Sequence, residues 1–347
     1  MTLLPHSATL PNPKIISISP AAALPGGEME LRGSGLTPDG PRQPVAFIDE
    51  VAATIVMSQA SRVLLRVPEG ALSGNASVRV EGNTSNAMPV AVGVMAADNV
   101  HAVSNPAADA EGNLYVTLSG SRGQETPVSV FQIDTQGQIR PFVSGIMNAT
   151  GLALDTDGNL YVSSRHDGIV YRVTPSGAKS VFAEGMGVAT GLAFDAIGNL
   201  YVGDRSGTIF KIAPDRQIFV FATLEPSVAA YHLAFNAAGV LFVSGPTTSS
   251  NECIHAIDRE GAITEYYRGL GRPQGLAFDA AGNLYVAASL EGRRGIVKIT
   301  PKRQASLVVS GSGIVGLALL PDGDIAVATQ TCVYHLAMGI TGNLLRK

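Results

Sequence analysis

The chain has 347 residues, of which 46% are hydrophobic and 15% are charged, and its formal net charge is −4. This composition supplies a sizeable core and excludes a disordered chain, and the acidic excess excludes a nucleic-acid partner because a phosphate backbone needs a basic surface. No run of about 18 apolar residues occurs, so a transmembrane helix is not expected. The 39 glycines and 20 prolines predict a turn-rich, all-β fold.

The N-terminal part of the chain shows three patterns. Residues 1–11 are predicted to be an N-terminal tail, and they lack the basic region and the unbroken apolar stretch of a secretory signal, which favours a cytoplasmic location. Residues 12–93 contain about seven short apolar stretches divided by turn residues, which predicts a small antiparallel β-sandwich. Residues 94–100 are predicted to be a linker.

Turn and strand positions within 12–93 form a characteristic set: Ser17 to Pro20, Gly26, Gly27, Gly33 to Gly35, Val67, Pro68 and Asn86. With these residues the segment resembles an IPT/TIG immunoglobulin-like (Ig-like) domain over nearly its full length. The resemblance implies a spacer or adhesion module that carries no chemistry of its own. It also favours the cell surface or a secreted location, so the compartment stays open between this and the cytoplasm.

One phrase recurs six times along the remainder of the chain. It reads DAEGNLYV, DTDGNLYV, DAIGNLYV, NAAGVLFV, DAAGNLYV and LPDGDIAV, and its glycines, from Gly112 to Gly323, lie 40 to 46 residues apart. A short apolar run such as GLAFD precedes most copies and two further runs follow, so each unit predicts four short strands. One such sheet cannot bury both faces, whereas six packed about an axis can. Residues 101–347 are therefore predicted to form a six-bladed β-propeller of four-stranded blades.

The third copy, VATGLAFDAIGNLYVGDRSGTIFKIAP, carries Gly191, Asp195, Gly198, Asn199, Tyr201 and Asp204 at consensus positions of a known repeat. The unit resembles the NHL repeat, and residues 97–347 as a whole resemble the SMP-30/gluconolactonase/LRE-like propellers. A WD40 propeller is excluded because the chain has no Trp. The Asp and Gly of each D-x-x-G-N element are predicted to close the turn between the first two strands of a blade.

The two cysteines, Cys253 and Cys332, fall at equivalent positions of blades four and six. Equivalent atoms two blades apart exceed the roughly 7 Å Cα separation that a disulfide tolerates. Both are therefore predicted to be unpaired thiols, which favours a reducing compartment.

In such a propeller the loops entering the first strands and the loops joining second to third strands share one face, around the mouth of the central channel. Functional groups are expected to gather there. The predicted ligand-binding residues are Asn105, Thr150, Thr190, Tyr231, Gln274 and Arg205. The candidates for catalysis are His166, with Asp167 beside it, His232, Arg165 and Asp204.

The lactonase resemblance implies a divalent metal held by a Glu before the first strand of blade one and by Asn or Asp before later first strands. The corresponding residues are Asn105, Thr150, Thr190 and Gln274, and none of them carries a carboxylate. A hard cation such as calcium prefers several oxygen ligands that include carboxylates. No metal and no cofactor are therefore predicted.

Three functions remain open. The leading hypothesis is a non-catalytic recognition or scaffold protein that binds a protein or peptide, a glycan or a small molecule at the channel mouth. The alternative is an SMP-30/gluconolactonase-like hydrolase, a lactonase, or an isomerase with an altered, metal-poor site. Its acid–base groups would be His166 and His232, Arg165 would anchor the substrate, and calcium or another divalent cation would be the cofactor. The third is a structural partner in a surface assembly. Neither the ligand nor the oligomeric state follows from the sequence.

Overall fold

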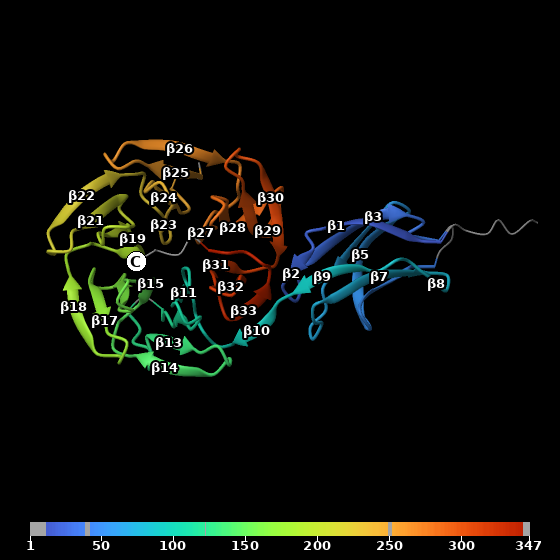
Figure 1. Cartoon of the computed structure of the whole chain (residues 1–347), viewed down its shortest axis with the longest axis horizontal. Coiled ribbons are helices and arrows are strands. Elements are labelled where there is room, and N and C mark those ends of the chain that lie inside the picture. The colour runs from blue at the N-terminus through green and yellow to red at the C-terminus, as the bar shows by residue number, and fades with distance from the viewer. Residues whose placement is uncertain (1–11, 39–41, 122, 249–251, 343–347) are drawn as a thin grey trace, which may run out of the picture. The chain divides into compact units, whose positions relative to one another are not determined.

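The computed structural model describes residues 12–38, 42–121, 123–248 and 252–342, so the predicted tail at 1–11 lies outside the described residues. All regular structure in these ranges is β-strand, as predicted, and they contain no helix that could cross a membrane. The chain divides into two compact units, residues 1–93 with 308–311 and residues 94–307 with 312–347. Figure 1 shows the strands of the second unit standing around a common centre.

The first unit is a mostly antiparallel β-structure built on alternating apolar residues, in which β2 pairs parallel with β9. Met29 and Leu31 of one strand and Val63 and Leu65 of its neighbour are fully buried in one shared core. This period of two is the pattern of strands with one buried face. The strands are β1 (Lys14–Ser19), β2 (Ala22–Ala23), β3 (Glu28–Ser34), β4 (Val45–Ile48), β5 (Val51–Gln59), β6 (Arg62–Arg66), β7 (Gly74–Val80), β8 (Asn83–Thr84) and β9 (Met88–Val92).

The longest strand of the first unit, β5, joins two groups of strands. Its first residues pair with β4 and its later residues pair with β6, with an irregularity in register between Ile55 and Met57. The strand order is β1-β3-β6-β5-β4-β7-β9, and β8 pairs with β7. Because β5 belongs to both groups, residues of β3, β6, β4 and β7 meet in a single core.

The second unit is a β-propeller in which five blades are separate four-stranded antiparallel sheets. Strands β27 to β30 pair in the same order, β30-β29-β28-β27. The strands are β11 (Ala107–Ala108), β12 (Leu114–Thr117), β13 (Val130–Ile133), β14 (Ile139–Val143), β15 (Ala149–Leu154), β16 (Leu160–Ser164), β17 (Val170–Val173), β18 (Lys179–Ala183), β19 (Ala189–Phe194), β20 (Leu200–Asp204), β21 (Thr208–Ile212), β22 (Ile218–Thr223), β23 (His232–Phe235), β24 (Leu241–Ser244), β25 (Cys253–Ile257), β26 (Ile263–Arg268), β27 (Leu276–Phe278), β28 (Leu284–Leu290), β29 (Arg293–Ile299), β30 (Ala305–Ser310), β31 (Ile314–Leu319), β32 (Asp324–Thr329), β33 (Val333–Ala337) and β10 (Val94–Ala97).

The predicted linker at 94–100 is not an unpaired connection, because β10 pairs antiparallel with β33. The last repeat supplies three strands of its own, and its third strand would otherwise leave a row of unpaired backbone groups at the sheet edge. Strand β10 covers that edge and completes the sheet β10-β33-β32-β31. The beginning and the end of the second unit are therefore joined by backbone hydrogen bonds.

The recurring D-x-x-G-N elements close turns, as predicted. In the third copy the Asp195 carboxylate accepts hydrogen bonds from the backbone N–H groups of Ile197 and Asn199 and from the Asn199 side chain. Gly198 has a φ of 87°, a conformation that L side chains rarely adopt. These carboxylates are thus occupied by their own turns. The prediction for the cysteines is also confirmed, since Cys253 and Cys332 are free thiols.

The first strands of neighbouring sheets approach one another very closely at the centre of the propeller. A Cβ atom on Gly151 would lie less than 3.0 Å from the Thr190 carbonyl oxygen, and one on Gly316 would lie 2.6 Å from the Ser104 carbonyl oxygen. Real Cβ atoms essentially never come so near another heavy atom. The glycine of the GLA sequence is therefore required by the packing of one blade on the next.

We predict that Gly151→Ala lowers the free energy of unfolding by about 1–3 kcal/mol, the usual range for overpacking a close-packed position. Gly271→Ala is the matched control, because its nearest heavy atom would be the Ser289 Cβ atom at 3.3 Å and not a backbone carbonyl. The measurement is chemical denaturation of the wild type and both variants. Equal stability of the two variants would contradict the packing argument.

Candidate functional site

A cavity of about 210 Å³ opens where the loops before the first strands and after the second strands converge. Its lining comes entirely from the propeller unit and includes five residues predicted from the sequence. The loops meet because antiparallel pairing sets the start of each first strand beside the end of the second, as in Ala149 opposite Ser164 and Ala189 opposite Asp204. The five predicted residues are Thr150, Thr190, Gln274, Arg165 and Arg205.

The two threonines of this cavity are held by the propeller itself. Thr190 Oγ1 donates a hydrogen bond to the Gly203 carbonyl oxygen, 2.8 Å away, and accepts one from the Tyr231 backbone N–H at 3.1 Å. Thr150 Oγ1 donates to the Asn148 carbonyl oxygen at 2.9 Å. Both side chains are almost fully buried. Their hydroxyl groups are therefore hydrogen-bonded to neighbouring backbone. They give the cavity a neutral lining that offers no charged oxygen to a metal ion.

Three arginines dominate the charge of the cavity: Arg165, Arg205 and Arg272. Arg165 Nη2 donates to the Gly120 carbonyl oxygen at 3.1 Å, and Arg205 Nη2 donates to the Val228 carbonyl oxygen at 3.0 Å. Neutral carbonyl groups thus fix the position of these guanidinium groups without cancelling their charge. The ion pairs found in the described residues involve other groups, namely Arg32, Arg62, Arg66, Arg268 and the pair of His335 with Asp324.

A fourth arginine, Arg294 of β29, lies directly behind Gln274. Its Nη2 atom donates to Gln274 Oε1 at 2.6 Å, and its Nη1 atom donates to the Arg272 carbonyl oxygen at 2.9 Å. Burial lowers the pKa of Arg294 to about 10, with the charge of Arg272 acting in the same direction and Glu252 opposing it. Burial and the nearby charge of Arg205 also lower the pKa of Arg165. The positive charges are therefore close enough to repel one another.

Two other predicted ligand-binding residues serve the packing of the propeller and do not line the cavity. Asn105 Nδ2 donates to the Leu276 carbonyl oxygen at 2.9 Å, and its Oδ1 atom accepts the Leu317 backbone N–H at 3.1 Å, so it ties β27 and β31 together. Tyr231 is 2% exposed, and its hydroxyl donates to the Glu225 carbonyl oxygen. Burial raises the pKa of Tyr231 to about 12. Both side chains are occupied within the fold.

The candidates for acid–base chemistry are not brought together. His166 is exposed, and the Asp167 carboxylate beside it accepts the Ile169 backbone N–H and the Tyr171 hydroxyl of its own turn. Asp204 accepts the Val188 backbone N–H at 2.8 Å and a hydrogen bond from the Ser206 hydroxyl. None of these three predicted side chains lines the cavity.

His232 stands where four of the other five repeats have glycine, and it is 2% exposed. Its Nε2 atom is buried and has no hydrogen-bond partner among the described residues. Burial lowers the pKa of His232 to about 3, and the charge of Arg294 adds to the effect. The imidazole is therefore neutral at physiological pH, and it does not line the cavity.

Sequence reasoning missed Arg272, His101 and Gln330, all of which line the cavity. In the loops that enter first strands, the prediction covers only the residue immediately before the strand, whereas Arg272 lies two positions before Gln274 in GRPQGL. Arg272 also has a φ of 47°, which turns the chain sharply ahead of β27. The signal that points to Arg272 is its basic side chain within the entering loop of β27.

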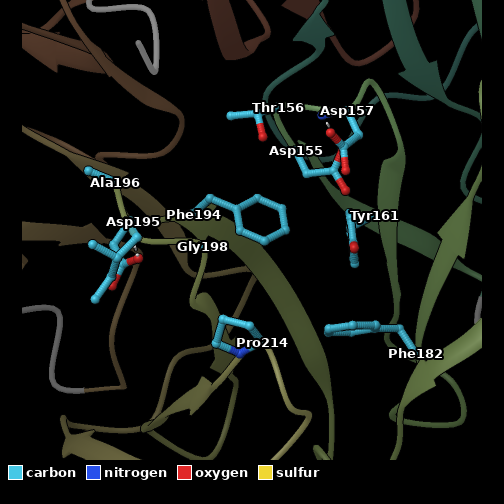
Figure 2. Close-up of a pocket in the computed structure, with 11 residues that line it drawn as sticks. Asp155, Thr156, Asp157, Tyr161, Phe182, Phe194, Asp195, Ala196, Gly198 and Pro214 are labelled. Carbon is cyan, nitrogen blue, oxygen red and sulfur yellow. Dashed lines mark hydrogen bonds between the residues drawn. The ribbon is translucent and has the colours of Figure 1, made fainter. Parts of the chain in front are cut away.

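A larger cavity of about 670 Å³ lies near the D-x-x-G-N turns, between β15–β18 and β19–β22 (Figure 2). The Tyr161 ring meets the Phe182 and Phe194 rings edge to face, both at 4.9 Å between centroids. The same arrangement recurs at the next blade junction, where Tyr201 meets Phe221 and Phe235. We therefore assign this aromatic cluster to packing between blades.

Comparison with known proteins gives structural relatives only. No family model matches the chain, and no curated protein matches it. A candidate gluconolactonase is similar to 72% of this chain over 93% of its own length, with 18% identity and a TM-score of 0.60. An auxiliary nutrient binding protein from Bacteroides thetaiotaomicron is similar over 94% of this chain and 98% of its own, with 12% identity and a TM-score of 0.55. Virginiamycin B lyase from Staphylococcus aureus is similar over 70% and 97%, with 14% identity and a TM-score of 0.52.

The lowered pKa of His232 predicts a pH-dependent contribution to stability. The unfolded chain takes up a proton near pH 6.5 and the folded chain near pH 3, so the unfolded state binds more protons between these values. The contribution is complete above pH 6.5 and falls by about 1.4 kcal/mol per pH unit below it. His232→Gln removes it. Denaturation at pH 7, 6, 5 and 4 should show the wild type losing more stability than the variant, and parallel curves would contradict the prediction.

Proposed function

We propose that this protein is a non-catalytic recognition protein that binds a ligand at the mouth of the propeller channel. One observation carries the proposal. Side chains from separate blades converge on a cavity of about 210 Å³, in which hydrogen bonds hold Arg165 and Arg205 in place. The candidate acid–base residues His166, His232 and Asp204 do not line this cavity. At roughly 30 Å³ for each water molecule, the cavity has room for about seven waters, so it suits a small molecule or one residue of a longer chain.

We further propose the finer architecture that this function uses. Strands β27–β30 would act as a sixth blade of the ring, and the N-terminal β-structure would be an Ig-like β-sandwich of the IPT/TIG type that serves as a spacer. Support for a sixth blade comes from the Gly275 backbone N–H, which donates to the Val315 carbonyl oxygen, and from Ser244 Oγ, which donates to the Gln274 carbonyl oxygen. These bonds join β27–β30 to its neighbours on both sides. The repeat spacing supports an NHL-like unit.

The structural relatives fit binding as well as catalysis. The auxiliary nutrient binding protein is named for binding, and virginiamycin B lyase is named for an enzymatic reaction. The candidate gluconolactonase keeps a lactonase or related hydrolase as the second hypothesis. Under that hypothesis a divalent cation would have to bind near Thr150, Thr190 and Gln274, but these side chains offer neutral oxygens only, and a hard cation prefers carboxylates. We therefore propose that the site uses no metal and no cofactor.

Blocking the cavity tests whether it is the binding site. Ala229 is half-buried and lines the cavity, so Ala229→Leu should obstruct it without changing any charge. Ala238→Leu, on the same blade and beyond the other end of β23, is the matched control at an exposed position. Ligands are first identified by ligand-observed NMR in a screen of metabolites, saccharides and short peptides. Calorimetry with these ligands should then show at least tenfold weaker binding to Ala229→Leu and unchanged binding to Ala238→Leu. Equal affinity of both variants would contradict the proposal.

The hydrolase hypothesis requires His166 as an acid–base group, whereas the binding proposal gives this side chain no role. Because this side chain is exposed and does not line the cavity, we predict that His166→Ala leaves ligand affinity unchanged. The same variant is assayed with aldonolactones as substrates. Saturable lactone hydrolysis by the wild type that His166→Ala abolishes would establish an enzyme in place of a binding protein.

A further inference from the structure

The cavity at the channel mouth is strongly cationic in a chain whose net charge is −4. Arg165 follows β16, Arg205 follows β20, and Arg272 precedes β27, so three separate sheets each contribute one guanidinium group. Such convergence is not a consequence of overall composition. It concentrates positive charge at one point of an otherwise acidic protein.

Two of the three guanidinium groups, those of Arg165 and Arg205, are held in place but retain unused donors. Arg165 and Arg205 are anchored by the carbonyl oxygens of Gly120, Ser227 and Val228. A guanidinium group has five N–H donors in a planar fork, and such a fork matches the two oxygens of a carboxylate or phosphate. One or two donors of each group are used by these carbonyls, so the others can reach a ligand.

Charged groups outside the cavity lining also act on the cluster. Arg294 adds a fourth positive charge behind the cavity wall through its hydrogen bond to Gln274. Glu252 acts in the opposite direction: its charge raises the pKa of Arg294, and its carboxylate accepts a hydrogen bond from the Arg272 backbone N–H. Burial is the main cause of the lowered pKa values of Arg165 and Arg294, and the charges of Arg205 and Arg272 add to it, so an anion placed among these groups would relieve the repulsion between them.

The remainder of the lining sets the character of the ligand. Val103, Val228, Ala229 and Val315 are apolar, and among the residues that the structure describes no Asp or Glu lines the cavity. An uncharged or cationic ligand would leave the guanidinium groups unpaired in a partly buried place, which is costly. A ligand with one anionic group and a small body satisfies both the charge and the volume.

We propose that the ligand of this site is a small compound with an oxyanion, a carboxylate or a phosphate, which is seated between Arg165, Arg205 and Arg272. This inference rests on the proposed binding function and specifies its ligand class. It assigns Arg165 and Arg205 the role of direct ligand contacts.

The test uses acetate and inorganic phosphate as minimal probes with the full-length protein. Each is titrated at constant ionic strength against sodium chloride while the arginine Nε–H resonances are followed by NMR. We expect saturable shifts at Arg165, Arg205 and Arg272, with a dissociation constant at or below the millimolar range for the preferred probe. Tighter binding of phosphate would indicate a phosphate ester, and tighter binding of acetate would indicate a carboxylic acid.

The variant Arg165→Gln/Arg205→Gln should weaken binding of the preferred probe at least tenfold. Lys302→Gln, which removes one exposed charge away from the cavity, should leave it unchanged. The melting temperature without probe is measured for both variants to show that they stay folded, because the double variant also loses the hydrogen bonds to the carbonyl oxygens of Gly120, Ser227 and Val228. Absence of saturable shifts, or equal binding by wild type and double variant, would overturn the inference.

Failure of this inference can be told apart from failure of the proposed function. If a neutral ligand binds the wild type and the arginine double variant equally, and Ala229→Leu loses it, then the mouth is a binding site but not an oxyanion site. If Ala229→Leu alters no binding at all, the mouth is not the binding site and both proposals fall.

Discussion

The close approach of the first strands at the propeller centre is the constraint on which the rest of this structure depends. Gly151, Gly275 and Gly316 leave no room for a Cβ atom, because backbone or Asn105 atoms of neighbouring sheets occupy that space. Hydrogen bonds then cross from sheet to sheet at the same level, including Ser104 Oγ to the Thr150 carbonyl oxygen at 2.6 Å. The close packing of the glycines and the hydrogen bonds between sheets therefore occur at the same place. A substitution that disturbs one would also disturb the other.

This packing also explains why the channel mouth is a defined site. The strand ends are fixed at the centre, so the loops that leave them start from rigid positions. Arg165 and Arg205 extend from such loops and are held by carbonyl oxygens of neighbouring loops. The same packing engages Asn105, Tyr231 and the two threonine hydroxyls in hydrogen bonds within the fold, so these groups are not available to a ligand. What remains available at the mouth is mainly positive charge and apolar surface.

The D-x-x-G-N turns contrast with the channel mouth. Asp155 and Asp195 line the larger cavity in Figure 2, yet each carboxylate accepts hydrogen bonds from its own turn. These carboxylates stabilise their turns by accepting backbone hydrogen bonds. The arginines, in contrast, hydrogen-bond to neutral groups and keep their charge. Within the described residues, the structure thus separates charges that stabilise the fold from charges that stay available to a ligand.

The sequence by itself determined the all-β class, the repeat and its four strands, the turn role of Asp195, the free thiols, and five residues of the mouth. These features are encoded locally, by period-two burial, by glycine and by spacing. Only the tertiary structure decided that β10 completes the last sheet, that Asn105 and Tyr231 are occupied in packing, and that Arg272 joins Arg165 and Arg205. Those outcomes depend on which loops meet and which hydrogen bonds consume a side chain, and residues from distant repeats set both.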